Sequence, residues 1–119
     1  MKNKTILLIQ TGLAAVFLAN ALTAIFNPGE FTEIIENSFI GAVIPTGIAL
    51  VIIAVNDGLM TLLILFSKKW RPPIFGWAVI WIAVVLIAIG EPLDILEESG
   101  FLFMALALFF DARNYKLTN

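Results

Sequence analysis

The chain has 119 residues, of which 61% are hydrophobic and 13% are charged. Soluble domains average about 45–50% apolar and about 25% charged residues, and a soluble chain of this size leaves roughly a third of its surface in water. The composition therefore predicts an integral membrane protein in contact with the lipid bilayer. The sequence has no Cys and no His, which excludes disulfides, thiol catalysis and metal sites built on either residue. Its net charge of −2 argues against a nucleic-acid partner.

Stretches without charged side chains predict four membrane helices within a single transmembrane domain, residues 1–119. A spanning helix needs about 20 mostly apolar residues. The expected spans are 5–26, 39–66, 73–90 and 93–112. The last span reaches a sufficient length only when an acidic outer segment with Glu97 and Glu98 is included. The predicted fold class is all-α, an integral membrane four-helix bundle.

The segment 28–38, between the first two spans, has the pattern of a short amphipathic surface helix. Asn27 and Pro28 are residue types that begin helices. Phe31 and Ile35 share one face of this segment, and its glutamates lie largely off that face. We expect the helix to lie on the outer surface of the membrane. The alternative is that it packs over the mouth of the bundle as a lid.

The second span contains Asn56-Asp57-Gly58, a combination that forms turns in soluble proteins. A true turn would leave residues 59–66 too short to cross the membrane. We therefore expect a kink or local unwinding inside one continuous helix over 39–66, because neighbouring helices can satisfy the freed backbone groups.

The basic residues indicate an orientation, since all seven lie on one side of the four-span topology. They are Lys2, Lys4, Lys68, Lys69, Arg71, Arg113 and Lys116. The loops on the opposite side carry acidic residues without any Lys or Arg. By the positive-inside rule, both termini are expected in the cytoplasm of a multi-pass protein of the cell membrane.

Asp57 is the main candidate for a functional residue, because a carboxylate inside a membrane helix costs about 2.5–3.5 kcal/mol at the bilayer centre on insertion scales. The expected spans hold no Lys or Arg that could pair with it. The functional interpretation is a proton-linked or ligand-binding carboxylate. The structural interpretation, which we favour, is a hydrogen bond that holds the first two spans together.

Four further polar residues complete the candidate cluster, which is interpreted as either ligand-binding or structural. Gln10 is expected at a depth similar to that of Asp57, and Thr61 lies one helical turn from Asp57 on the same face. Asn56 is its immediate neighbour. Asn20 projects towards the outer half, where it could line a polar pocket or bond to a neighbouring helix. No catalytic residue is expected.

The acidic residues of the outer side raise the question of a metal site, because Ca²⁺ and Mg²⁺ prefer oxygen ligands. They are Glu30, Glu33, Glu36, Glu91, Asp94, Glu97 and Glu98. No loop has the ligand spacing of a calcium motif, and acids are tolerated on the outer side of a membrane protein. We therefore predict no metal site.

The sequence resembles the DoxX-like family of small four-helix membrane proteins in three places. The matching stretches are Gly12-Leu13-Ala14-Ala15-Val16-Phe17-Leu18 with Asn27-Pro28-Gly29-Glu30-Phe31, Asn56-Asp57-Gly58-Leu59-Met60, and Gly100-Phe101-Leu102 with Ala105-Leu106-Ala107-Leu108. It departs from the family where a Lys often precedes the first Pro and where Arg-Asp often precedes the last Gly. The resemblance implies a four-helix bundle and, by analogy, an accessory subunit of a redox complex or a chaperone of membrane proteins.

The leading functional expectation is a non-catalytic accessory subunit, or an interaction or assembly partner, of a larger membrane or redox complex. One alternative is a quinone-linked redox subunit, for which Trp77 and Trp81 could supply aromatic walls, although the sequence has no cofactor motif and we expect no cofactor. Another alternative is a small transporter centred on Asp57, which would have to oligomerise to form a pore. A protein partner or a homo-oligomer is therefore expected.

Overall fold

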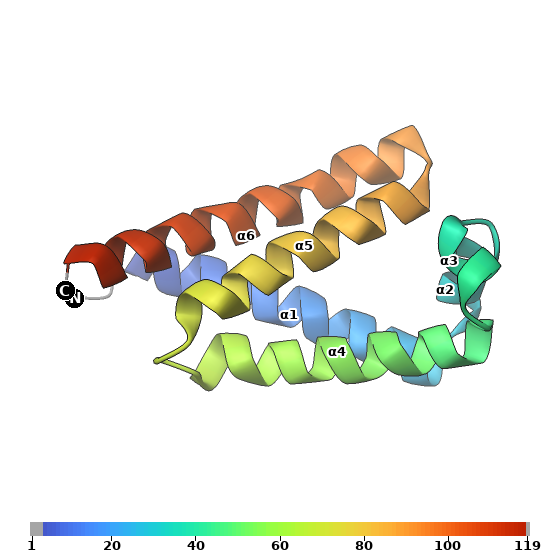
Figure 1. Cartoon of the computed structure of the whole chain (residues 1–119), viewed down its shortest axis with the longest axis horizontal. Coiled ribbons are helices and arrows are strands. Elements are labelled where there is room, and N and C mark those ends of the chain that lie inside the picture. The colour runs from blue at the N-terminus through green and yellow to red at the C-terminus, as the bar shows by residue number, and fades with distance from the viewer. Residues whose placement is uncertain (1–3, 119) are drawn as a thin grey trace.

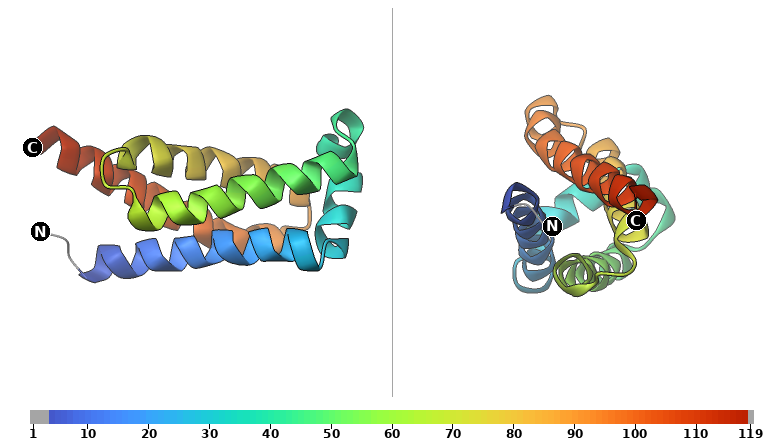
Figure 2. Two further views of the ribbon diagram at one scale, coloured as in Figure 1. Left: turned by 90° about the horizontal axis from the view of Figure 1, so that it is seen from below. Right: turned by 90° about the vertical axis from the view of Figure 1, so that its left-hand side faces the viewer.

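The computed structural model describes residues 4–118 and is all-α, as the sequence predicts (Figure 1). The described chain contains six helices: α1 (Lys4–Phe26), α2 (Gly29–Glu36), α3 (Phe39–Val43), α4 (Thr46–Phe66), α5 (Arg71–Ile89) and α6 (Pro92–Thr118). The four long helices α1, α4, α5 and α6 run alongside one another. The short helices α2 and α3 stand across one end of the molecule (Figures 1 and 2).

Three of the long helices, α1, α4 and α5, are long and apolar enough to cross a membrane. They contain 23, 21 and 19 residues, or about 28–35 Å of helix, which matches a bilayer core of about 30 Å. α6 has 27 residues but is not among these three, because charged residues near both of its ends leave a shorter uncharged middle. The helices therefore indicate a multi-pass membrane protein.

The long helices form two pairs, α1 with α4 and α5 with α6, which make the most extensive contacts between elements in the described chain. The pairs meet in a core that lies towards the end holding the α4–α5 link. It includes residues up to Phe17 in α1, from Met60 onwards in α4, up to Ile82 in α5 and from Ala105 onwards in α6. At the other end, the volume between the pairs is not filled by this core.

The two short helices α2 and α3, hereafter the cover helices, close that other end. Ile35 of α2 is only 2% exposed, and α2 contacts α1, α4 and α5. The expected amphipathic helix is therefore present, but its apolar face packs over the bundle, as the lid alternative proposed. Asn27 does not cap it, since the helix begins after Pro28 without a side-chain cap.

The expected continuous helix over 39–66 is wrong at its start, because α3 ends at Val43 and α4 begins at Thr46. Pro45 lies between them with ψ of 141°, an extended conformation, and it has no N–H to continue a helix. Ser38 begins α3 by accepting a hydrogen bond from the Ile40 N–H at 3.2 Å. In contrast, α4 remains helical through Asn56-Asp57-Gly58, so these residues form no turn and no unwound segment.

The other helix boundaries differ from those expected at 73–90 and 93–112 by two residues or fewer, except at the end of α6. α5 ends at Ile89 and is followed by Gly90, whose φ of 78° lies in the left-handed region that favours glycine as a helix terminator. α6 starts at Pro92, a residue type suited to a first helical turn. It continues to Thr118, beyond the expected end at 112.

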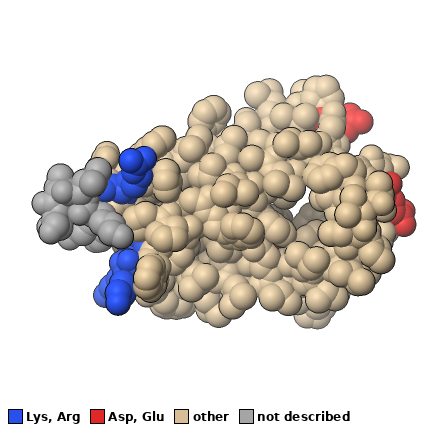
Figure 3. All heavy atoms as spheres, in the orientation of Figure 1, with Lys and Arg blue, Asp and Glu red and all other residues tan. Residues whose placement is uncertain are grey.

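Charged side chains gather at the two ends of the long axis. The described chain extends 45 × 26 × 22 Å. On the face shown in Figure 3, Lys and Arg lie at the end with the α4–α5 link, and Asp and Glu lie at the end with the cover helices. We call these the basic end and the acidic end. The start of α1 and the end of α6 both lie at the basic end (Figure 1).

Candidate functional site

A cavity of about 600 Å³ lies beneath the cover helices. It occupies the acidic half of the molecule, where the two helix pairs separate, and a hollow is visible on this side in Figure 3. Its walls come from all six helices and consist mostly of apolar side chains, among which isoleucine is the most frequent. The core residues described above hold the pairs together on the other side of it.

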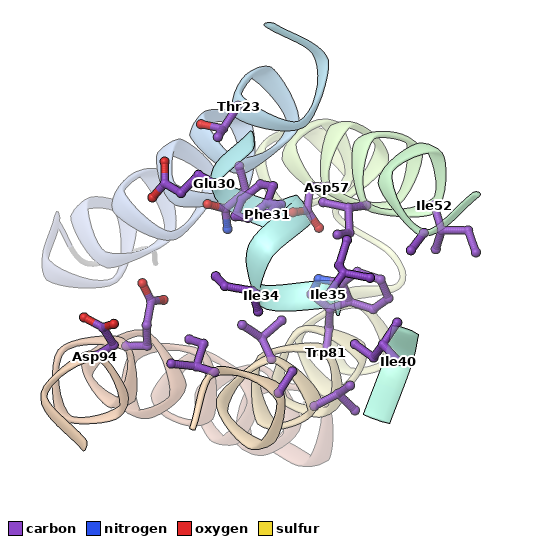
Figure 4. Close-up of a pocket in the computed structure, with 18 of the residues that line it drawn as sticks. Thr23, Glu30, Phe31, Ile34, Ile35, Ile40, Ile52, Asp57, Trp81 and Asp94 are labelled. Carbon is purple, nitrogen blue, oxygen red and sulfur yellow. The ribbon is translucent and has the colours of Figure 1, made fainter. Parts of the chain in front are cut away.

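Asp57 contributes the deepest charged group of this cavity. Its side chain is only 1% exposed, and it lines the cavity from α4. Figure 4 shows Asp57 from α4 and Trp81 from α5 around the same pocket as Phe31 and Ile35 of the cover helix α2. The cover helices thus lie over a space with apolar walls and a carboxylate at its floor.

A short chain of hydrogen bonds orients the Asp57 carboxylate. Asn56 Nδ2 donates to Asp57 Oδ1 at 2.9 Å. Trp77 Nε1 of α5 in turn donates to Asn56 Oδ1 at 2.8 Å. This arrangement links α4 to α5, and it fixes the amide of Asn56 so that its NH₂ group faces the carboxylate.

Trp81 is the aromatic residue at the cavity floor. Its side chain lies close enough to interact with the Asp57 carboxylate, and its ring centroid lies 6.2 Å from that of Trp77. The two tryptophans therefore have different surroundings. Trp77 forms a hydrogen bond with Asn56, whereas Trp81 lines the cavity.

Gln10 lies away from the cavity, at the basic end. Its Nε2 donates to the carbonyl oxygen of Ile64 at 2.6 Å, in the last turn of α4, where carbonyl groups lack intrahelical donors. Its Oε1 accepts a hydrogen bond from Arg71 Nη1 at 3.1 Å. The guanidinium of Arg71 also lies 5.0 Å from the ring centroid of Phe75. Gln10 thus joins α1 to both sides of the α4–α5 link.

The break at Pro45 explains why Gln10 does not lie level with Asp57. With α4 beginning at Thr46, Asp57 lies within about 2 Å of the middle of its helix, at 1.5 Å per residue. Gln10 lies about 7 Å from the middle of α1 towards the basic end. A helix that starts at Phe39 has its middle closer to the outer side, so the expected span places Asp57 too far towards the basic end.

The remaining two candidates have different positions. Thr61 is buried, and its hydroxyl donates to the main-chain oxygen of Asp57 at 2.8 Å, so its hydroxyl supports the backbone of α4 rather than the carboxylate. Asn20 lines the cavity from α1, together with Thr23. Of the five candidates, the structure thus brings Asp57, Asn56 and Asn20 to the cavity or its edge.

Acidic side chains surround the cavity towards the acidic end. Glu30 of α2 and Asp94, Glu97 and Glu98 of α6 are among its lining residues. The three residues of α6 are spaced so that their side chains share one face of the helix. Figure 4 shows Glu30 and Asp94 on opposite sides of the space. Among residues 4–118, no group of three or more acidic side chains is arranged to hold a metal ion.

Sequence reasoning missed three parts of this site. The sequence suggests Trp81 only as one of a pair with Trp77. It suggests a lid only as the alternative for segment 28–38, and it places the residues of α3 in the second span. The pairing of Gln10 with Arg71 was not foreseen, because the two residues are 61 positions apart. The one usable signal was the helical spacing of Phe31 and Ile35, which marks an apolar face that has to be covered.

Comparisons of the chain with protein-family models, with curated proteins and with solved structures found no match. The chemistry of the site therefore rests on its own geometry. The cavity has apolar walls, an aromatic ring and a buried carboxylate, which together suit binding of a small molecule.

Proposed function

We propose that the chain is a small four-span membrane protein that binds an apolar small molecule in the cavity beneath its cover helices. The observation that carries this proposal is the cavity of about 600 Å³, since small-molecule sites are typically clefts of about 300–1,000 Å³ with apolar walls and a few polar groups. Binding rather than catalysis is proposed, because the sequence has neither Cys nor His.

The four-span topology is part of this proposal. α6 packs along α5 in the same bundle as the three apolar helices, and the molecule is 45 Å long, close to the roughly 40–45 Å of a bilayer with its headgroups. The one-sided distribution of Lys and Arg supports an orientation in which the basic end faces the cytoplasm. The cavity then opens in the outer half of the membrane.

Photolabelling in phosphatidylcholine nanodiscs tests the binding function. A diazirine-bearing octanol is expected to label the cavity-lining peptides of α4 and α5 in a saturable manner. Val85→Trp should abolish the saturable labelling, because Val85 lines the cavity and the larger ring fills it. Ile87→Trp is the matched control, since Ile87 on the same helix is 72% exposed. Labelling that stays unsaturable and spreads over the exposed faces would contradict the proposal.

An accessory role in a larger membrane or redox complex is the second proposal. It is supported by the resemblance to DoxX-like proteins, which we propose as the family of this chain, and by the absence of Cys and His from the sequence. A bound quinone would be one form of this role, with Trp81 as the aromatic wall. Copurification of a larger membrane protein in mild detergent would support it, and recovery of the chain alone or as a homo-oligomer would count against it.

A further inference from the structure

We propose that the ligand of the cavity is a lipophilic organic cation, an apolar body that carries one positive charge, such as a protonated amine. The inference rests on the proposed binding function and names the class of ligand. It follows from the distribution of charge and apolar surface around the cavity.

The charges that line the cavity are all negative. Its carboxylates are Glu30, Asp57, Asp94, Glu97 and Glu98. Among the described lining residues there is no Lys and no Arg. An anionic ligand would be repelled by this lining, and a neutral ligand would gain nothing from it. A cation is attracted first by the outer acids and then by the carboxylate at the floor.

Asp57 provides the most specific argument, because it is a charged residue type that is 1% exposed. Its carboxylate accepts a hydrogen bond from the neutral amide of Asn56 at 2.9 Å. A neutral donor cannot balance the charge of a buried carboxylate, which is costly to keep out of water without an ionic partner. A ligand cation at the floor would supply that partner.

Trp81 adds a second interaction for a cation at the same place. It lines the cavity beside Asp57, and cations are attracted to the face of an indole ring within about 6 Å of its centroid. A carboxylate together with an aromatic ring is therefore a suitable site for an ammonium group.

The apolar walls indicate that the cation is organic. Ile34, Ile53 and Val85 line the same cavity as Asp57 and the outer acids. A bare metal ion requires several oxygen ligands around it, and these side chains offer none. An apolar body attached to the charge would instead bury its surface against them, at about 25 cal/mol per Å².

Three ligands of one shape test the inference: phenylbutylamine, phenylbutanol and phenylbutyrate, which carry a positive charge, no charge and a negative charge. Each competes with the diazirine-bearing octanol for saturable labelling in phosphatidylcholine nanodiscs. We expect the amine to compete at least about tenfold more strongly than the alcohol, given the attraction of close opposite charges. The acid should compete least.

Two variants test whether Asp57 causes the preference for the amine over the alcohol. Asp57→Asn, of similar shape, is expected to remove most of the preference for the amine over the alcohol. Asp111→Asn is the matched control with the same change of charge, because Asp111 is not among the lining residues. If Asp57→Asn does not fold, the triple variant Asp94→Asn, Glu97→Gln, Glu98→Gln replaces it and should also weaken the preference for the amine.

The outcomes separate this inference from the function on which it rests. Equal competition by amine and alcohol in the unmodified protein would overturn the inference that the ligand is a cation. It would leave the proposed binding function in place. A full preference for the amine in Asp57→Asn would also overturn the inference, and so would a full preference in the triple variant. Absence of saturable labelling by the octanol itself would overturn the binding function.

Discussion

Gln10 is the single residue on which packing at the basic end depends most directly. It donates to Ile64 of α4 and accepts from Arg71 of α5. One nitrogen of the Arg71 guanidinium, Nη2, is buried without a hydrogen-bond partner in the described chain, so the bond from Nη1 to Gln10 is an important polar contact of this group.

Replacing Gln10 by Leu should therefore destabilise the protein by about 1–3 kcal/mol, because it leaves buried polar groups unpaired. The free energy of unfolding in mixed micelles measures this loss. Thr11→Val is the matched control. The Thr11 hydroxyl bonds only within its own helix, to Leu7, at an exposed position, so its loss should cost well under about 1 kcal/mol. Equal stability of the two variants would contradict the role assigned to Gln10.

The residue scale also shows where prediction from sequence ends. Asp57, Asn56 and Asn20 could be selected as candidates because polar residues in apolar helices are few and have to be paired or functional. The residues to which they form hydrogen bonds could not be predicted. The bonds from Trp77 to Asn56 and from Arg71 to Gln10 depend on the relative rotation and depth of helices. Side-chain types at distant positions in a sequence do not specify that rotation.

Among the elements, the cover helices are the ones that decide access to the cavity. They approach each other closely at Gly41 of α3. A Cβ atom at this position would lie 2.5 Å from the Ile35 carbonyl oxygen and 3.1 Å from the Glu36 Cα atom. Both neighbours are backbone atoms, so they cannot rotate away as a side chain would.

Gly41→Ala should therefore push α3 away from α2 and loosen both cover helices, at a cost of about 1–3 kcal/mol. Hydrogen–deuterium exchange of residues 29–43 should rise, while exchange in the core half of the bundle stays unchanged. Gly47→Ala is the control, since a Cβ atom there meets nothing within 4 Å. Unchanged exchange in Gly41→Ala would mean that the two helices do not pack as described.

The elements could be predicted from the sequence where the length of an apolar stretch alone determines the helix. The lengths of the apolar stretches placed α1 and α5 to within about two residues. The start of α4 was missed because a membrane helix can tolerate Pro, whereas here Pro45 separates two helices. The choice between a surface helix and a lid also stayed open, because an amphipathic pattern does not distinguish lipid from protein as the apolar partner.

For the whole molecule, the number of spans and their orientation give the clearest test. The chain contains no Cys, so single cysteines report their own position without background. Asn37→Cys places one at the acidic end, Ser67→Cys in the α4–α5 link, and Asn114→Cys in the last part of α6.

A membrane-impermeant maleimide should label Asn37→Cys in intact cells, and the other two variants only after the membrane is opened. The physical reason is the distribution of Lys and Arg, which keeps the basic end in the cytoplasm. Labelling of Ser67→Cys in intact cells would contradict the orientation. Labelling of Asn114→Cys but not Ser67→Cys would show that α6 does not cross the membrane.

The cavity could not be predicted from the sequence, although the residues that line it could be picked out in part. The sequence indicated the buried acid, the outer acids and the amphipathic segment, but not that they surround one space. That space exists because the two helix pairs pack near the basic end and separate towards the other, where the cover helices close it. It is a property of the assembled bundle, and no local pattern encodes it.

The infrared spectrum of the Asp57 carboxyl group tests the central claim most directly. Phenylbutylamine is added to the protein in phosphatidylcholine nanodiscs, with Asp57→Asn as the blank and phenylbutanol as the control ligand. A cation at the cavity floor should shift a carboxyl or carboxylate band that is absent from the blank, and the alcohol should shift it much less. The same difference spectrum in both proteins, or an equal response to amine and alcohol, would contradict the claim that Asp57 receives a cationic ligand.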